Sequence, residues 1–235
     1  MVSVAMGESH ATFASSDNFK LKQSVKMNPL TFINSNGWNR FRYTLYAPGY
    51  DLAGRIFAKS RNKSIKELGI NRGDSVLIVG AGTGLDLEFI SEECHITATD
   101  ITPAMIARTI KRNILRKLDL QAKVMDGQHL SLPDCSEDKI ILHLILAVIP
   151  DPVLCLKECE RVLKPGGRIT IFDKFVPKGR KLSLLRKVFN PLTNVLFSNI
   201  NRRFEDIVSK TNLKIESDIP ADFNGNFRII RFIKC

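Results

Sequence analysis

Short apolar runs alternate with longer segments of helical periodicity through the middle of the chain. Apolar and β-branched residues fill five runs that we predict to be strands, at 75–79, 95–99, 122–125, 139–144 and 168–172. Helical patterns lie before and between them, at 51–68, 83–91, 102–118 and 151–163. Strands that alternate with helices in this way form βαβ units, whose helices cover both faces of a parallel sheet. The pattern therefore predicts an α/β fold.

The carboxyl-terminal segment has a different pattern. Two apolar runs, at 213–216 and 227–234, are separated by a loop that contains Asn224-Gly225, a turn signal. We expect these runs to form an antiparallel pair at the edge of the sheet. The resulting organisation is one domain over residues 51–235, preceded by an arm over residues 1–50 that includes a lid.

Composition and charge narrow the class of protein. With 44% hydrophobic and 25% charged residues, the chain is neither collagen-like nor a disordered tail. The 35 Lys and Arg residues against 24 Asp and Glu give a net charge of +11, which favours an anionic partner. We find no apolar run of about 18 residues and no leader pattern, so we expect neither a transmembrane helix nor a signal peptide. Five irregularly spaced cysteines indicate reduced thiols, no metal site and a cytoplasmic location.

A glycine-rich turn follows the first predicted strand. Gly80, Gly82 and Gly84 permit a tight turn and let a ligand approach the backbone, just before a helix with free N–H groups. Asp100 ends the second strand about 20 residues later, where a carboxylate can accept from both hydroxyls of a ribose. Asp126 opens the loop after the third strand, where a carboxylate or amide can accept from the amino group of adenine. This spacing indicates a nucleoside-binding site.

Four segments resemble the class I S-adenosylmethionine-dependent methyltransferases. They are VLIVGAGTGLD (76–86), ITATDITPAMI (96–106), DGQHLSLPD (126–134) and ERVLKPGGRITIFD (160–173). The resemblance implies a Rossmann-like, doubly wound sheet of seven strands with the last strand antiparallel. It implies S-adenosylmethionine as cofactor and S-adenosylhomocysteine as its product. The cofactor residues that it implies are Gly80, Gly82, Thr83 and Gly84 at the methionine end, Asp100 and Ile101 at the ribose, and Asp126, Gly127 and Gln128 at the adenine, with His143 nearby.

One position departs from the pattern of that family. Most members carry an acidic residue two positions before the first glycine, where it helps to anchor the methionine part, and this chain carries Ile78. Tyr46, Tyr50 or a backbone carbonyl could hold the ammonium group instead. A noncatalytic binding protein that kept the fold is therefore a second alternative.

The candidate catalytic residues are His143, Asp173, Tyr46 and Tyr50. Methyl transfer is an in-line displacement that mainly requires alignment and exclusion of water, so no catalytic triad is needed. His143 is either a base for the substrate or a histidine of the core or cofactor shell. Asp173 could lie near an acceptor amine. The tyrosines belong to an aromatic segment, 38–50, which is either a pocket lid that contacts cations or ordinary packing.

A basic insert follows the fifth predicted strand. Residues 178–203 contain seven basic residues and no acidic one, with apolar residues at helical spacing. Such a segment either lies on an anionic membrane surface, together with the basic arm, or forms a lid over the pocket. The chain is accordingly expected in the cytoplasm, with a peripheral position at the membrane as one interpretation.

A narrower resemblance concerns the substrate. YAPGYDLAGRIF, GTGLDLEFI, AVIPDP and FDKF are similar to soluble bacterial phosphatidylethanolamine N-methyltransferases and to quinone-biosynthesis C-methyltransferases. Both groups act on lipid substrates, so the leading prediction is methylation of the ethanolamine nitrogen of a phospholipid. The alternative is a soluble methyltransferase for a small molecule or quinone precursor. The Asn/Asp-Pro-Pro-aromatic motif of base methylases is absent, which argues against a nucleic-acid partner, and the sequence leaves the oligomeric state open.

Overall fold

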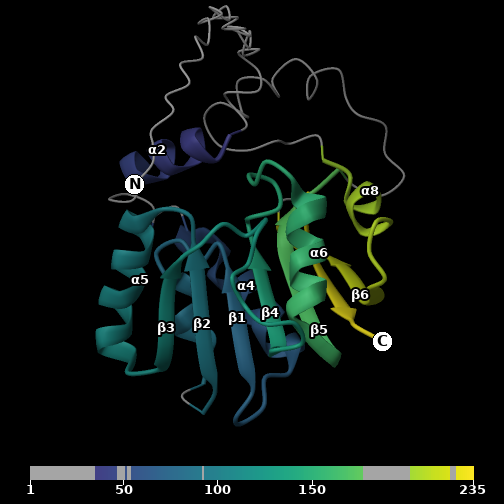
Figure 1. Ribbon diagram of the computed structural model, residues 1–235, viewed down its shortest axis with the longest axis horizontal. Helices are drawn as coiled ribbons and strands as arrows, with labels where there is room; N and C mark the ends of the chain where they lie inside the picture. The colour runs from purple at the N-terminus through teal and green to yellow at the C-terminus, as the bar shows by residue number, and fades with distance from the viewer. Residues whose placement is uncertain (1–34, 47–50, 52–53, 92, 177–201, 223–225) are drawn as a thin grey trace, which may run out of the picture.

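The protein is built on one seven-stranded sheet, shown in Figure 1. The computed structural model describes residues 35–46, 51, 54–91, 93–176, 202–222 and 226–235. The strand order is β3-β2-β1-β4-β5-β7-β6. The strands are β1 (Ser75–Val79), β2 (His95–Asp100), β3 (Asp119–Val124), β4 (Glu137–His143), β5 (Leu163–Lys174), β6 (Lys214–Pro220) and β7 (Phe227–Ile233).

Strand direction confirms the predicted topology. β3, β2, β1, β4 and β5 pair in parallel, whereas β7 is antiparallel to both β5 and β6. β1 is apolar after Ser75, and β4 carries the apolar run Ile140-Ile141-Leu142, because helices cover both faces of these strands. The antiparallel pair predicted at the carboxyl terminus is therefore present, with β7 inserted between β5 and β6.

Helices pack on the two faces of the sheet. They are α4 (Ala58–Leu68), α5 (Pro103–Arg116), α6 (Pro152–Val162) and α8 (Phe204–Val208), with 3-10 turns η1 (Arg55–Phe57) and η2 (Leu85–Phe89). α2 (Asn36–Tyr46) lies instead over the carboxyl ends of the strands (Figure 1). On one face, α6 and α8 bury Leu156 and Phe204 against β4, β5 and β7. On the other, α4 buries Ile65 and Leu68 against β1 and β4. α5 packs along β2 and β3, at the left in Figure 1.

The structure corrects several predicted boundaries. The helix predicted over 83–91 is the short 3-10 turn η2, because Gly82 and Gly84 hold positive φ angles of 58° and 80° and delay its start. The helix predicted over 51–68 is regular only from Ala58. β5 begins at Leu163 rather than 168, because its register against β4 shifts around the Pro-Gly-Gly segment. β3 likewise begins earlier than predicted, at Asp119.

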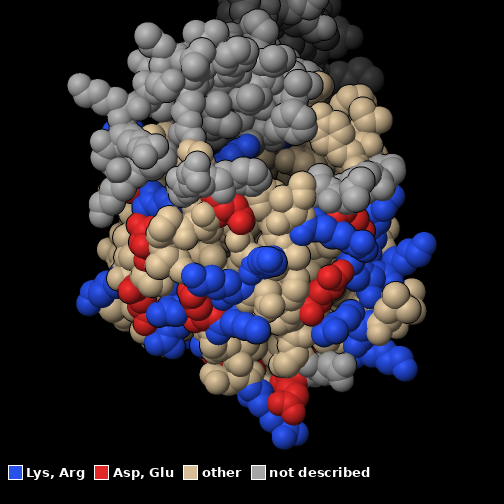
Figure 2. All heavy atoms as spheres, turned by 180° about the vertical axis from the view of Figure 1, so that it is seen from behind, with Lys and Arg blue, Asp and Glu red and all other residues tan. Residues whose placement is uncertain are grey.

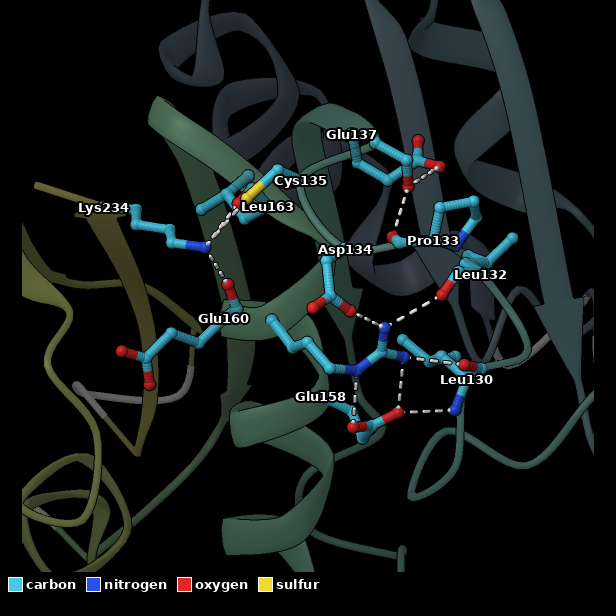
Figure 3. A network of polar contacts seen from close by, with 12 residues as sticks. Leu130, Leu132, Pro133, Asp134, Cys135, Glu137, Glu158, Glu160, Leu163 and Lys234 are labelled. Atoms are coloured by element: carbon cyan, nitrogen blue, oxygen red, sulfur yellow. Dashed lines mark hydrogen bonds and ion pairs between the residues drawn. The ribbon is translucent and has the colours of Figure 1, made fainter.

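The ERVLKPGG segment, at 160–167, fixes the loop between β3 and β4. Arg161 of α6 donates to the carbonyls of Leu130 at 2.7 Å and Leu132 at 2.9 Å, and it pairs with Glu158 and Asp134 (Figure 3). These carboxylates raise the pKa of the Arg161 guanidinium. Lys234 caps the carboxyl end of α6. Arg161 therefore holds the loop that begins at Asp126.

Candidate functional site

A pocket lies at the carboxyl ends of the strands, the edge at which open α/β sheets bind ligands. Its floor comes from the glycine turn after β1 and from the ends of β2, β3 and β4. α2 covers one side, and the turn over 144–149 forms another wall. Of the predicted cofactor residues, the pocket lining contains Gly80, Gly82, Asp100, Ile101, Asp126, Gly127 and His143.

The glycine turn has no room for side chains. Gly80 has a φ of +71°, and a Cβ atom there would lie 2.8 Å from the Ile145 side chain. Gly84 has a φ of +80°, and a Cβ atom would lie 3.2 Å from the backbone of Thr109 in α5. Thr83 is buried beneath the turn, where its hydroxyl donates to Asp51. The turn thus exposes backbone to the pocket, as close approach of a ligand requires.

Asp100 is fixed by the backbone of two neighbouring segments. Its Oδ2 accepts from Gly82 N at 3.0 Å and its Oδ1 accepts from Thr102 N at 2.8 Å. Burial raises the pKa of this carboxyl group, while the two N–H donors act against the rise. The predicted ribose acid therefore lies beside the glycine turn, with a fixed orientation.

Asp126 and Gln128 form a pair at the end of β3. Gln128 donates to Asp126 from both its backbone N, at 2.9 Å, and its side chain, at 3.1 Å. Gln128 Oε1 accepts from Asp151 N at 2.8 Å, which ties the pair to the start of α6. Asn36 of α2 donates to Asp126 Oδ2 at 2.6 Å. The pair thus presents a fixed carboxylate to the pocket, and Gln128 itself is buried behind it.

His143 lies at the pocket wall, and both of its ring nitrogens have protein partners. Nε2 lies 2.9 Å from the Ser64 hydroxyl, and Nδ1 lies 2.8 Å from Asp86 Oδ1. Asp86 also binds Arg61 at 2.7 Å. Burial by itself would raise the pKa of Asp86, but Arg61 and His143 hold it well below its usual range. This geometry favours the core or cofactor-shell interpretation of His143 over the substrate base.

Asp173 lies outside the pocket lining and supports the wall from behind. It is buried, and its oxygens accept from Ala147 N at 3.0 Å and Lys174 N at 2.7 Å. Burial raises the pKa of Asp173 to about 6. Arg202 donates to the carbonyl of Ile149 at 2.6 Å on the same turn. Asp173 is therefore placed to position the turn rather than to touch a substrate.

The aromatic arm reaches the pocket through α2. Tyr43 lines the pocket. The Tyr46 ring packs edge-on against the Tyr43 ring, with ring centroids 6.3 Å apart. Tyr50 lies outside the described residues, as do most of the basic insert, at 177–201, and the arm at 1–34. Ile78 is buried among apolar residues of β1 and α4, so it offers no polar atom to a methionine group.

Several residues of the site were not found from the sequence. Asn36 and Asn39 line the pocket from α2, and Asn39 donates to the carbonyl of Val148 at 3.0 Å. Ser64 and Arg61 reach His143 and Asp86 from α4. No spacing signal links these residues, because 79 positions separate Ser64 from His143. Of the residues in this polar cluster, Asp86 could have been found from the sequence, since it ends the glycine-rich motif at 76–86.

The residues present fit S-adenosylmethionine. The pocket offers bare backbone at the glycine turn, an oriented carboxylate at Asp100 and another at Asp126. The first could carry the methionine end, the second the ribose hydroxyls and the third the adenine amino group. At position 78, where most members of the family carry an acidic residue for the methionine end, this chain has the apolar Ile78.

Known proteins share this fold and parts of this sequence. Residues 77–171 match the family described as "Methyltransferase domain". A phosphatidylethanolamine N-methyltransferase of Cereibacter sphaeroides is 27% identical over 188 residues, which cover 78% of this chain and 91% of the relative. A demethylmenaquinone methyltransferase of Listeria monocytogenes is 29% identical over 143 residues, 56% of this chain and 60% of the relative. The chain thus spans under two thirds of the second relative.

Solved structures agree on the fold. A putative sarcosine dimethylglycine methyltransferase from Galdieria sulphuraria has a TM-score of 0.64 at 17% identity, over 78% of this chain and 87% of that one. A geranyl diphosphate methyltransferase solved with SAM has the same TM-score, 0.64, at 12% identity, over 77% of this chain and 87% of that one. At these identities the likeness concerns the fold alone.

Proposed function

Because this chain is an S-adenosylmethionine-dependent methyltransferase, we propose that it methylates the ethanolamine nitrogen of a phospholipid at a membrane surface. The observation that carries the proposal is the match with a phosphatidylethanolamine N-methyltransferase along 91% of that relative. The pocket and the surface of α2 support it, as argued below.

The reaction is a displacement at carbon. Bound S-adenosylmethionine supplies a methyl group activated by its positive sulfur. An acceptor amine in its neutral form would displace this methyl group, the electrons of the carbon–sulfur bond would stay on sulfur, and the new ammonium group would lose its proton to water. Asp100 and Asp126 hold the nucleoside, and the backbone at Gly80 and Gly82 faces the methionine end. Alignment and exclusion of water provide most of the rate gain in such a step.

The acceptor site lies under α2. Tyr43 lines the pocket, and its ring packs edge-on against that of Tyr46. Aromatic rings at this place can contact an alkylated ammonium group through cation–π interaction. We expect Tyr50 to take part in the same way. His143 and Asp173 act as positioning residues, the first through Asp86 and Ser64 and the second through the turn that begins at Leu144.

The outer surface of α2 and α5 supports a peripheral position at the membrane. Phe41 and Leu45 are 64% and 68% exposed on α2, on the side opposite its buried Asn39. On α5 the exposed apolar residues are Ile110, Ile114 and Leu115. Neither helix contains an acidic residue. Apolar residues among basic ones suit an anionic lipid surface. None of the helices in the described part of the chain has both the length and the hydropathy to cross a bilayer.

The test is methyl transfer to vesicles of phosphatidylethanolamine and phosphatidylglycerol, with radiolabelled cofactor. The double variant Phe41→Glu with Leu45→Glu should lose vesicle binding and transfer to vesicles, yet keep transfer to detergent-dispersed lipid. Ile215→Glu on β6, at the far edge of the sheet, is the matched control because Ile215 is also exposed. Absence of label in phosphatidylethanolamine in both formats would refute the substrate.

A second candidate is carbon methylation of a quinone precursor. Its support is the match with the demethylmenaquinone methyltransferase. The same assay with a demethylated quinone in place of the phospholipid distinguishes the two. Label in the quinone and none in the phospholipid would establish the second candidate.

A further inference from the structure

The side chain of Asn36 bridges both members of the pair at the end of β3. Asn36 Nδ2 donates to Asp126 Oδ2 at 2.6 Å, and Asn36 Oδ1 accepts from Gln128 Nε2 at 3.4 Å. Asn36 is the first residue of α2 and stands 90 positions before Asp126 in the chain. The contact therefore ties the start of the lid helix to the loop assigned to adenine.

A primary amide and the edge of adenine present similar hydrogen-bonding groups. Adenine carries an amino donor at N6 beside a ring-nitrogen acceptor, and the Asn side chain carries an NH₂ donor beside a carbonyl acceptor. The other contacts of the Asp126 carboxylate come from its own loop: Gln128 donates to it, and His129 Nδ1 lies 3.8 Å from Oδ2. Asn36 is therefore the contact that an adenine amino group would have to replace.

We propose that the Asn36 side chain and the adenine of the cofactor bind the same groups of Asp126 and Gln128, so that the cofactor and the start of α2 compete for Asp126. The cofactor's adenine takes the place of the Asn36 amide and releases the first turn of α2. Asn39, one turn further on, keeps its contact with the carbonyl of Val148. The helix then turns about Asn39, and the position of Tyr43 on the same helix changes with it.

This competition would set an order of binding. Because Tyr43 faces the acceptor side of the pocket, entry of the cofactor would prepare the site for the amine. That last consequence rests on the proposed function, whereas the competition itself concerns the cofactor alone. The helix start does not depend on Asn36, because Ser35 Oγ accepts from Trp38 N at 3.2 Å as a cap.

The first experiment is calorimetric titration of the full chain with S-adenosylhomocysteine and with adenosine. Asn36→Ala should bind both ligands more tightly, by between about two- and tenfold, the range for loss of one competing hydrogen bond. Asn39→Ala removes the same side-chain amide one turn later and should give no tightening. Thr44→Ala, on the exposed side of α2, should match the wild type. Weaker or unchanged binding by Asn36→Ala would overturn the proposal.

The second readout is hydrogen exchange of α2, which needs no acceptor. In the wild type, S-adenosylhomocysteine should speed exchange at the first turn of α2. In Asn36→Ala that turn should already exchange quickly without ligand, and the ligand should change it little. Slower exchange on binding in the wild type would show that the cofactor fastens the helix instead, which contradicts competition. Since neither experiment contains a lipid, failure here leaves the proposed substrate untouched.

Discussion

At the scale of single residues, Asp100 is the carboxylate on which the cofactor site depends most directly. It lies at the end of β2 and accepts from Gly82 N and Thr102 N. Asp100→Ala should weaken binding of S-adenosylhomocysteine on the order of a hundredfold, because hydrogen bonds to a charged group contribute about 1.5–3 kcal/mol each. Calorimetry measures the change. The control is Asp119→Ala on the exposed edge strand, and equal affinity of the two variants would contradict the assignment.

Asp86 is the second residue whose charge can be tested, and its effect is on stability. It is fully buried between Arg61 and His143, and they hold its pKa below the usual range despite burial. Asp86→Asn leaves the Arg61 guanidinium without its carboxylate, which should cost about 3–5 kcal/mol in the free energy of unfolding. Urea unfolding at pH 7 measures it. A loss of unfolding free energy of no more than about 0.5 kcal/mol, the size expected for a surface substitution, would refute the predicted role of the Asp86 charge.

The pH dependence of the same pair has a defined sign. A carboxyl group whose pKa is lowered by folding contributes its full stability above the unfolded value, about 4, and loses it as the pH falls. The difference in unfolding free energy between the wild type and Asp86→Asn should therefore be constant near neutrality and shrink below about pH 4. A difference that grew on acidification would contradict the pairing.

At the scale of elements, the turn between β4 and α6 is held from outside the pocket. Asp173 accepts from Ala147 N, and burial raises its pKa to about 6 from the usual 3.8. A raised pKa means that the folded protein favours the protonated form, so stability falls as the pH rises from about 4 to 6. Relative to Asp173→Asn, the wild type should lose about 3 kcal/mol across that interval. Denaturant titrations at several pH values test it, and parallel profiles would refute it.

The elements also show what the sequence could and could not predict. Apolar runs predicted the positions of the strands, because burial on both faces leaves a continuous apolar signal. The sequence pattern overestimated the length of the helix at η2. Gly84 has a positive φ angle there, which delays the start of the helix and cannot be recognised from the pattern of apolar residues. Asp100 and Asp126 were found because each follows a strand at a spacing typical of nucleoside sites. Ser64 was not found, because its contact with His143 depends on how α4 packs.

At the scale of the whole molecule, acidic residues are mixed with the basic ones to a different degree on different parts of the surface. On the face seen from behind in Figure 2, Lys and Arg are interspersed with Asp and Glu. Ion pairs such as Arg231–Glu216 and Lys63–Glu67 offset part of the positive charge of the molecule. In α5 every charged residue is basic, next to exposed Ile114 and Leu115, and of these basic residues Arg112 pairs with Asp51 and Glu88 outside the helix. A net charge of +11 therefore does not act equally on all sides.

This asymmetry predicts which charge reversals affect membrane binding. Lys111→Glu on α5 together with Lys117→Glu, one residue after its end, should weaken binding to anionic vesicles strongly, since each basic residue near such a surface contributes about 1 kcal/mol. The same change in charge at Lys59 and Lys66 of α4 should have a much smaller effect, because these lysines are also exposed but lie on a different helix. Sedimentation with phosphatidylglycerol vesicles at low and high salt compares them. Equal loss in the two variants would mean that net charge alone drives binding, and that neither helix forms a defined contact with the bilayer.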